Sequence, residues 1–236
     1  MILTKERGNM ANKILESNLF KRVLTALMLI PIVIYVIIEG GILFDLFLGL
    51  IFIIATYEVI KIVANDKEIS SLKKLIWIIP IIIYIGLSMI ALRSIRLYDE
   101  GHFKIMVLFF SIWTFDSAAY FIGSWIGGPK LLLKISPKKT WSGLIGGMLF
   151  TFLIPNLIFI IMLNHVFLSP FAIIMGFYLS LIGVIGQVGD LMESYFKRRF
   201  RVKDSGNILP GHGGILDRLD SIFLASIFFY FLLKFR

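Results

Sequence analysis

Several acidic residues lie where apolar segments of the chain begin or end, and their spacing suggests metal chemistry. Asp217 and Asp220 are three positions apart, so on a helix both carboxylates share one face. Two such carboxylates repel each other unless a cation lies between them, and a few carboxylates completed by water and phosphate suit Mg²⁺. Asp190 closes another apolar segment. The alternative is that acidic residues simply favour the first turn of a helix, which accounts for Asp217 better than for the pair.

Two adjacent lysines precede one of the apolar segments. Lys138 and Lys139 are followed by Thr140 and Ser142, either of which is suited to cap the helix that comes next. A helix N-terminus beside two lysines favours an anion such as a phosphate group. Lysines that only set membrane topology account for the pair equally well.

The segment 194–214 is more strongly basic. It holds five cations between Lys197 and Lys203, and it ends in a turn where His212 is flanked by glycines. Topology alone does not require three glycines and a proline within five positions, which let the backbone bend sharply and approach a ligand closely. A single histidine is more often structural than functional, but we expect this segment as a whole to bind phosphate.

One carboxylate lies in the middle of an apolar segment. Asp116 shares a predicted helix face with polar residues that include Ser117 and Tyr120. A charge at the centre of a membrane helix costs about 2.5–3.5 kcal/mol on insertion scales, so this face must contact protein or water. Asp116 therefore either forms a structural hydrogen bond to a neighbouring span or lines a polar cavity.

The elements that position these residues are membrane helices. The chain has 236 residues, a hydrophobic fraction of 58% and a mean hydropathy of +0.90, well above a soluble domain. We predict an all-α polytopic membrane protein with about seven spans. They are Val23–Ile38, Ile42–Ile60, Leu75–Leu92, Ile105–Ile122, Leu144–Leu163, Pro170–Val188 and Ile215–Leu233.

The charges give the predicted orientation. The chain carries 24 Lys and Arg against 15 Asp and Glu, and this apolar composition favours a lipid bilayer over nucleic acid as the partner of the basic excess. With a cytoplasmic N-terminus, nineteen of the 24 cations fall on the cytoplasmic side, as the positive-inside rule predicts. The chain has no cysteine, which excludes disulfides and thiolate chemistry.

The run from Ser194 to Asp220 resembles the signature of the phosphatidate cytidylyltransferase family, whose members make CDP-diacylglycerol. The pattern is Ser-x-x-Lys-Arg, Lys-Asp-Ser-Gly, Pro-Gly-His-Gly-Gly and Asp-Arg-x-Asp. The run Asp116–Gly123, the motif Ser136–Thr140 and Gln187-x-Gly-Asp also look like the family pattern, so the resemblance covers about half of the chain. One position departs from it, because Ser142 stands where the family commonly has Glu.

The resemblance implies that CTP and phosphatidate react with Mg²⁺ to give CDP-diacylglycerol and pyrophosphate. It implies a metal centre at Asp190 and Asp217, with Asp220 as a further catalytic carboxylate. It also implies an integral protein of the bacterial inner (cytoplasmic) membrane with its site on the cytoplasmic face. The residues expected to bind the substrates are Asp116, Lys138, Lys139, Thr140, Ser194, Lys197, Arg198, Lys203, Asp204, His212, Gly213, Gly214 and Arg218.

We expect residues 1–104 to form N-terminal spans and residues 105–236 to form the catalytic region of one membrane domain. The glycines at 183, 186 and 189 make a smooth helix face that permits a homodimer. Three other functions compete with the cytidylyltransferase: a related transferase that uses a polyprenyl or phytyl lipid, a transporter or channel, and an enzymatically inactive relative.

Overall fold

The computed structural model describes residues 25, 27–163, 170–208 and 213–235, and most of them are helical. An apolar helix over Leu27–Glu39 precedes the labelled elements. These elements are α2 (Gly41–Asn65), α3 (Ser71–Leu97), α4 (Gly101–Ile126), β1 (Lys130–Leu132), β2 (Ser136–Thr140), α5 (Trp141–Leu163), α6 (Pro170–Arg199) and α7 (Leu216–Lys234).

The prediction of a helical membrane protein is confirmed. Four helices, α2, α3, α4 and α6, are long and apolar enough to cross a bilayer, while Leu27–Glu39 and Trp141–Ile154 are shorter apolar helices. The helix α7 is not among the four, and its first turn is charged. The number of seven spans is therefore not confirmed, although each predicted span from the second onward coincides with a helix.

The helix α6 is longer than its predicted span and changes the setting of Asp190. It continues to Arg199, so Asp190 lies within the helix and does not close it. Its last turn contains Lys197, Arg198 and Arg199, and cations at a helix C-terminus are favoured by the helix dipole. Hydropathy marks where the apolar stretch ends, but it does not mark where the helix ends.

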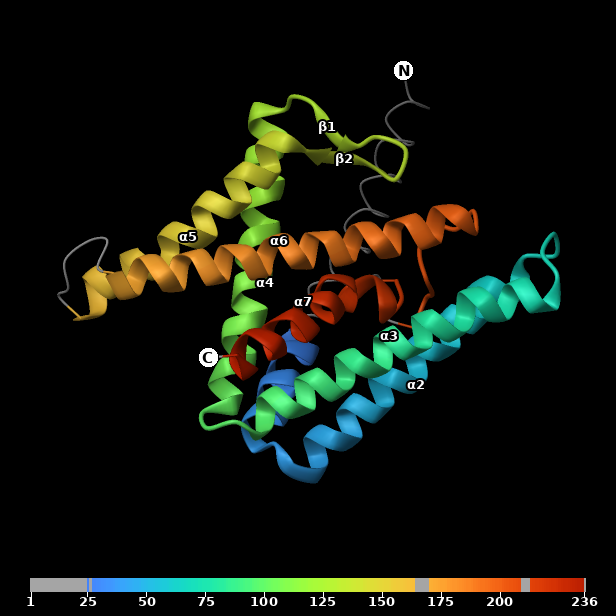
Figure 1. Cartoon of the computed structure of the whole chain (residues 1–236), viewed down its shortest axis with the longest axis horizontal. Helices are drawn as coiled ribbons and strands as arrows, with labels where there is room; N and C mark the ends of the chain where they lie inside the picture. Colours follow the sequence, from blue (N-terminus) through green and yellow to red (C-terminus); the bar gives the residue numbers. More distant parts are fainter. Residues whose placement is uncertain (1–24, 26, 164–169, 209–212, 236) are drawn as a thin grey trace, which may run out of the picture.

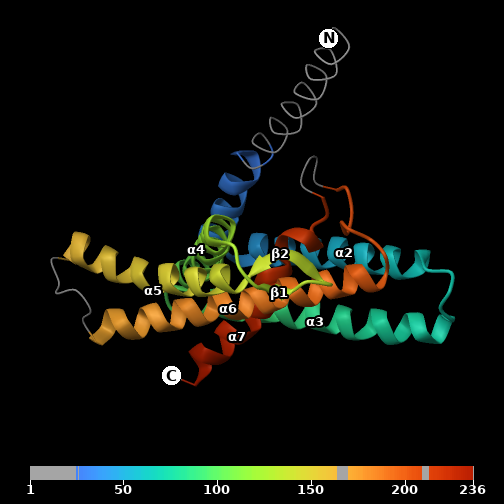
Figure 2. The same cartoon turned by 90° about the horizontal axis from the view of Figure 1, so that it is seen from above.

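Two helical hairpins extend in opposite directions from a centre formed by α4 and α7 (Figure 1). The hairpin of α2 and α3 points to one side, and the hairpin of α5 and α6 points to the other. The helix α4 crosses them steeply, because it runs along the vertical in Figure 1 and is seen nearly end-on in Figure 2. The helix α7 packs against both α3 and α6. One hydrophobic core includes residues from both predicted regions, for example Val59 and Phe223.

Glycines set the close approach of α6 to its neighbours. A Cβ on Gly183 would lie 2.4 Å from the ring of Phe115 in α4, and one on Gly189 would lie 2.6 Å from the Asp220 carbonyl oxygen in α7. The predicted packing role of these glycines is therefore confirmed inside the chain. Because this glycine face packs against helices of the same chain, it is not available as a homodimer interface. The homodimer stays a prediction.

Polar contacts join helix ends at two places in the molecule. At one end, Arg201 donates two hydrogen bonds of 2.9 Å to Glu68, so the α2–α3 turn lies beside the segment that follows α6. At the other end, Arg96 donates to the carbonyl oxygens of Ile37 and Ile38. The α2–α3 turn and the segment after α6, both of which the predicted alternation of spans puts on the cytoplasmic side, are therefore neighbours.

Candidate active site

A polar cavity of about 720 Å³ lies between α4, the β1–β2 hairpin, the start of α5 and α6. It contains Lys138 and Lys139, two of the lysines predicted to bind phosphate, and the predicted acidic residues Asp116 and Asp190. Its lining residues are Asp116, Ala119, Tyr120, Gly123, Ser124, Gly127, Lys130, Ser136, Pro137, Lys138, Lys139, Thr140, Gly143, Leu144, Gln187 and Asp190.

An ion pair crosses this cavity. The Nζ atom of Lys139 lies 2.6 Å from Oδ2 of Asp190, and the two side chains are 22% and 26% exposed. The other carboxylate oxygen of Asp190 accepts a hydrogen bond of 3.2 Å from Ser194. Asp116 lies within electrostatic reach of both partners of the pair. The lysine–aspartate pair therefore joins the hairpin to α6 inside a space that is open to a ligand.

The β1–β2 hairpin that carries Lys139 was not predicted from the sequence. Its strands pair antiparallel, with Lys130 opposite Thr140 and Leu132 opposite Ser136. Strands of three and five residues are too short to show a clear alternation of apolar and polar side chains. The hairpin places Lys139 toward Asp190, whereas Lys138 beside it is exposed.

Thr140 fixes the start of α5. Its hydroxyl oxygen accepts a hydrogen bond of 3.1 Å from the Gly143 amide, which is the geometry of a helix N-cap and confirms one of the two predicted caps. Ser142, the residue that departs from the family pattern, donates to the carbonyl oxygen of Gly127 at the end of α4. Ser142 therefore ties α4 to the start of α5.

A second, buried charge cluster lies at the junction of α6 and α7. The Nζ atom of Lys197 is 2.6 Å from Asp217 and 2.9 Å from Glu193, and all three side chains are largely buried. Asp217 also accepts hydrogen bonds from the backbone amides of Ser205 and Gly214, at 2.8 and 3.0 Å. Lys197 is therefore engaged inside the protein, and Asp217 holds the segment that precedes α7.

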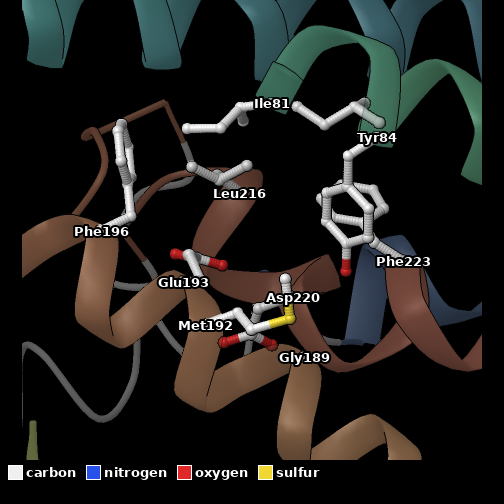
Figure 3. A pocket seen from close by; sticks show the side chains of 10 residues that line it. Ile81, Tyr84, Gly189, Met192, Glu193, Phe196, Leu216, Asp220 and Phe223 are labelled. Carbon is white, nitrogen blue, oxygen red and sulfur yellow. The ribbon is translucent and has the colours of Figure 1, made fainter. Parts of the chain in front are cut away.

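Asp220 lines a smaller cavity of about 80 Å³ beside this cluster (Figure 3). Glu193 and the hydroxyl group of Tyr84 face the same space, and α6 comes close to Asp220 at Gly189. The charges of Asp190 and Asp220 are within reach of each other. Sequence reasoning missed Glu193, although its i, i+4 spacing to Lys197 was a usable signal.

The remaining predicted residues belong to the segment from Arg198 to Arg218. Arg198 is exposed and donates to the carbonyl oxygens of Ile135 and Val202. Lys203, Asp204 and Arg218 are exposed. Gly213 has a φ of +86°, and a Cβ there would lie 2.9 Å from Asp217. His212 falls outside the described residues, so its predicted role stays a prediction.

The carboxylates fit a metal ion that arrives with its own phosphate ligands. Among the described residues, no group of three or more His, Asp and Glu side chains is arranged to hold a metal by itself. Mg²⁺ usually binds through one or two carboxylates, water and substrate phosphates. Asp190 lines the large cavity, and the charge of Asp220 lies within electrostatic reach of Asp190. Asp217 offers fewer free acceptor positions than Asp190, because two backbone amides contact it in addition to Lys197 and Ser205, whereas Asp190 contacts Lys139 and Ser194.

The architecture and this site define a polytopic helical membrane protein with a cationic cavity beside neighbouring carboxylates. Residues 66–236 match the model of the cytidylyltransferase family, and the chain belongs to that family. It is 37% identical to a phosphatidate cytidylyltransferase of Rickettsia bellii over 98% of both chains. It is 34% identical to the protein of that name in Rickettsia conorii, over 98% of this chain and 97% of the relative. The protein of that name in Bacillus subtilis is 42% identical over 64% of this chain and 55% of its own length.

Proposed function

We propose that this protein is a phosphatidate cytidylyltransferase, which transfers CMP from CTP to phosphatidate and releases pyrophosphate. The observation that carries the proposal is the Lys139–Asp190 pair inside the 720 Å³ cavity, because it places a cation and a carboxylate where phosphate groups can enter. The family match and the relatives' names supply the reaction class.

The reaction requires relief of charge more than it requires a base. A phosphate oxygen of phosphatidate forms a bond to the α-phosphorus of CTP, and the bond from that phosphorus to the bridging oxygen breaks, so pyrophosphate leaves. A phosphate monoester has its second pKa near ~6 and is already largely dianionic at neutral pH. Catalysis then depends on bringing two polyanions together, which positioned cations achieve.

The lysines of the cavity supply such cations. Lys130, Lys138 and Lys139 line one wall, and they would attract and orient the phosphate groups of both substrates. Mg²⁺, when bound with CTP, would neutralise part of the triphosphate charge. We assign it to Asp190, which lines the cavity, and to Asp220, whose charge lies within reach of Asp190, with Asp217 as the further ligand that the family resemblance implies.

Both substrates can reach a site of this kind at a membrane surface. CTP arrives from water, whereas phosphatidate diffuses within the bilayer, so the reacting groups must lie near an end of the spans. Exposed aromatic side chains of α4, such as Tyr120 and Trp125, are of the type that lies at membrane–water interfaces. We place this end on the cytoplasmic face of the bacterial inner membrane, where most of the chain's cations are predicted to lie.

A substrate comparison tests the proposal. Purified protein in lipid vesicles is incubated with Mg²⁺, labelled CTP and phosphatidate, and in parallel with other nucleotides and with polyprenyl or phytyl phosphate. We expect CDP-diacylglycerol and an equal amount of pyrophosphate only with CTP and phosphatidate. Product with only the other lipid phosphates would assign the protein to a different transferase. The absence of any pyrophosphate release would contradict the enzymatic proposal and favour a transporter or an inactive relative.

The Mg²⁺ dependence of turnover in three variants distinguishes the proposed metal ligands from a structural carboxylate. We expect Asp190→Asn and Asp220→Asn to raise the Mg²⁺ concentration needed for half-maximal turnover. Asp217→Asn should instead lower the thermal unfolding midpoint, because Asp217 holds Lys197 and two backbone amides. Near-normal Mg²⁺ dependence in the first two variants would refute the assignment of these carboxylates.

A further inference from the structure

A buried carboxylate in the N-terminal part of the chain lies against the signature segment. Glu58 belongs to α2 and is only 1% exposed, although α2 is otherwise apolar enough to span a bilayer. An ionisable residue at such a position is costly and calls for a partner. Glu58 also precedes residues 66–236, the part of the chain that the family model matches.

The partners of Glu58 are the first amides of α7. Its carboxylate accepts hydrogen bonds of 3.1 Å from the Ile215 amide and 2.9 Å from the Leu216 amide. Ile215 is the N-cap residue of α7 and has no polar side chain to cap the helix. The first amides of a helix need an acceptor, and a negative charge there also interacts favourably with the helix dipole. Glu58 therefore caps α7 from another helix.

The glycines of the signature are what allow this contact. A Cβ on Gly214 would lie 2.5 Å from Glu58 and 2.0 Å from the hydroxyl oxygen of Ser205. A Cβ on Gly206 would lie 2.7 Å from Glu58. The glycines of the turn 210–214 predict a close approach of the backbone to a ligand. At these two positions the close neighbour is the carboxylate of Glu58.

Ser205 links Glu58 to the charge cluster of α6 and α7. Its hydroxyl group lies 2.9 Å from Oε2 of Glu58 and 3.0 Å from Oδ2 of Asp217. Asp217 in turn binds Lys197 at 2.6 Å. A continuous chain of hydrogen bonds and one ion pair thus runs from α2 through Ser205 to α6.

We propose that Glu58 is a positioning residue for the reaction: it fixes the first turn of α7 and the segment 203–206, and through them the orientation of Asp217 and Asp220. This proposal rests on the proposed cytidylyltransferase function. Glu58 contacts neither the 720 Å³ cavity nor the Lys139–Asp190 pair. Its loss should therefore disturb the alignment of the reacting groups more than the binding of substrates.

The test compares Glu58→Gln, Glu58→Asp and Ser205→Ala with the control Asp45→Asn. Asp45 is a carboxylate of the same helix, thirteen positions before Glu58, and it pairs with Arg93. The amide of Gln keeps the size of the side chain but replaces one acceptor oxygen by a donor, whereas Asp keeps the carboxylate on a shorter stem. Each variant is assayed for CDP-diacylglycerol formation and for hydrogen–deuterium exchange of the segment 213–222.

We expect Glu58→Gln to lower kcat by about 10- to 100-fold, with KM for CTP and phosphatidate within about threefold of the wild type. Glu58→Asp should retain more activity than Glu58→Gln, and Ser205→Ala should lie between Glu58→Gln and the wild type. In Glu58→Gln the segment 213–222 should exchange faster, while the hairpin 130–140 stays unchanged. Asp45→Asn should leave both readouts at wild-type values.

Two results would overturn the proposal. One is normal turnover with unchanged exchange at 213–222 in Glu58→Gln. The other is uniformly faster exchange over the whole chain, which would mean that Glu58 only stabilises the fold. If the wild type makes no CDP-diacylglycerol, the proposed function fails. The exchange of the segment 213–222 would still show whether Glu58 anchors α7.

Discussion

The Lys139–Asp190 ion pair should act as a unit, and a double-mutant cycle reveals this. The two substitutions are Lys139→Met, which keeps the length of the side chain, and Asp190→Asn, which keeps its shape. Each removes a charge from the cavity and leaves its partner without its 2.6 Å contact. Since both residues line the cavity in which we place the reacting phosphates, each single variant should lose most of its activity.

The size of the effect follows from the geometry of the pair. At 2.6 Å and an effective dielectric constant of ~20, Coulomb's law gives an attraction of about 6 kcal/mol. Desolvation and partial exposure offset much of this, leaving a coupling free energy of about 1–3 kcal/mol. If each single substitution lowers kcat/KM about 100-fold, independent effects would multiply to about 10,000-fold. With that coupling, the double variant should lose only about 60- to 2,000-fold.

The assay is kcat/KM for CTP in vesicles at saturating phosphatidate, measured for the wild type, both single variants and the double variant. The matched control is Lys134→Met, because Lys134 is an exposed lysine of the same hairpin region that does not line the cavity. We expect the control to stay within about twofold of the wild type. A double variant that loses the full product of the single effects would refute the pairing.

Three further predictions concern packing, capping and the metal. Gly183→Ala should lower the thermal unfolding midpoint, because its Cβ would lie 2.4 Å from Phe115, and overpacking costs about 1–3 kcal/mol. The control Gly49→Ala, whose Cβ meets nothing within 4 Å, should keep the wild-type midpoint, and equal midpoints for the two variants would contradict the packing. Thr140→Val should lower the free energy of unfolding, measured by denaturation, by about 0.5–2 kcal/mol, whereas Thr140→Ser should keep the wild-type value. Equal loss of stability in both variants would argue against the cap. Chelation of Mg²⁺ should abolish CDP-diacylglycerol formation and its return should restore it, whereas turnover that persists in chelator would rule out a metal requirement.

Much of the architecture could be predicted from local sequence. Long apolar runs identify membrane helices because the bilayer tolerates few other structures, and α2 to α6 coincide with predicted spans. The same physics identifies Asp116, because a carboxylate inside an apolar run must face a polar space, and it does line the cavity. The lysines before α5, which the sequence predicts to bind phosphate, also line this cavity.

The partners of the charged residues could not be predicted in this way. Lys197 seemed to be one of several phosphate ligands, yet its neighbours on α6 and α7 engage it inside the protein. Lys139 and Asp190 are far apart in the sequence and meet only because a short hairpin folds onto α6. Glu58 contacts Leu216 across 158 positions, a separation at which spacing and periodicity carry no information.

The central claim is that the substrates occupy the cavity between α4, the hairpin and α6. The chain has no cysteine, so Ser136→Cys places a single thiol on the cavity wall, and Ser71→Cys places one on an exposed control site at the start of α3. The measurement is the rate at which a maleimide labels each thiol, with and without Mg²⁺, CTP and phosphatidate. We predict that the substrates slow the labelling of Ser136→Cys severalfold and leave Ser71→Cys unchanged. Unchanged labelling of Ser136→Cys at substrate concentrations that saturate turnover would contradict the account.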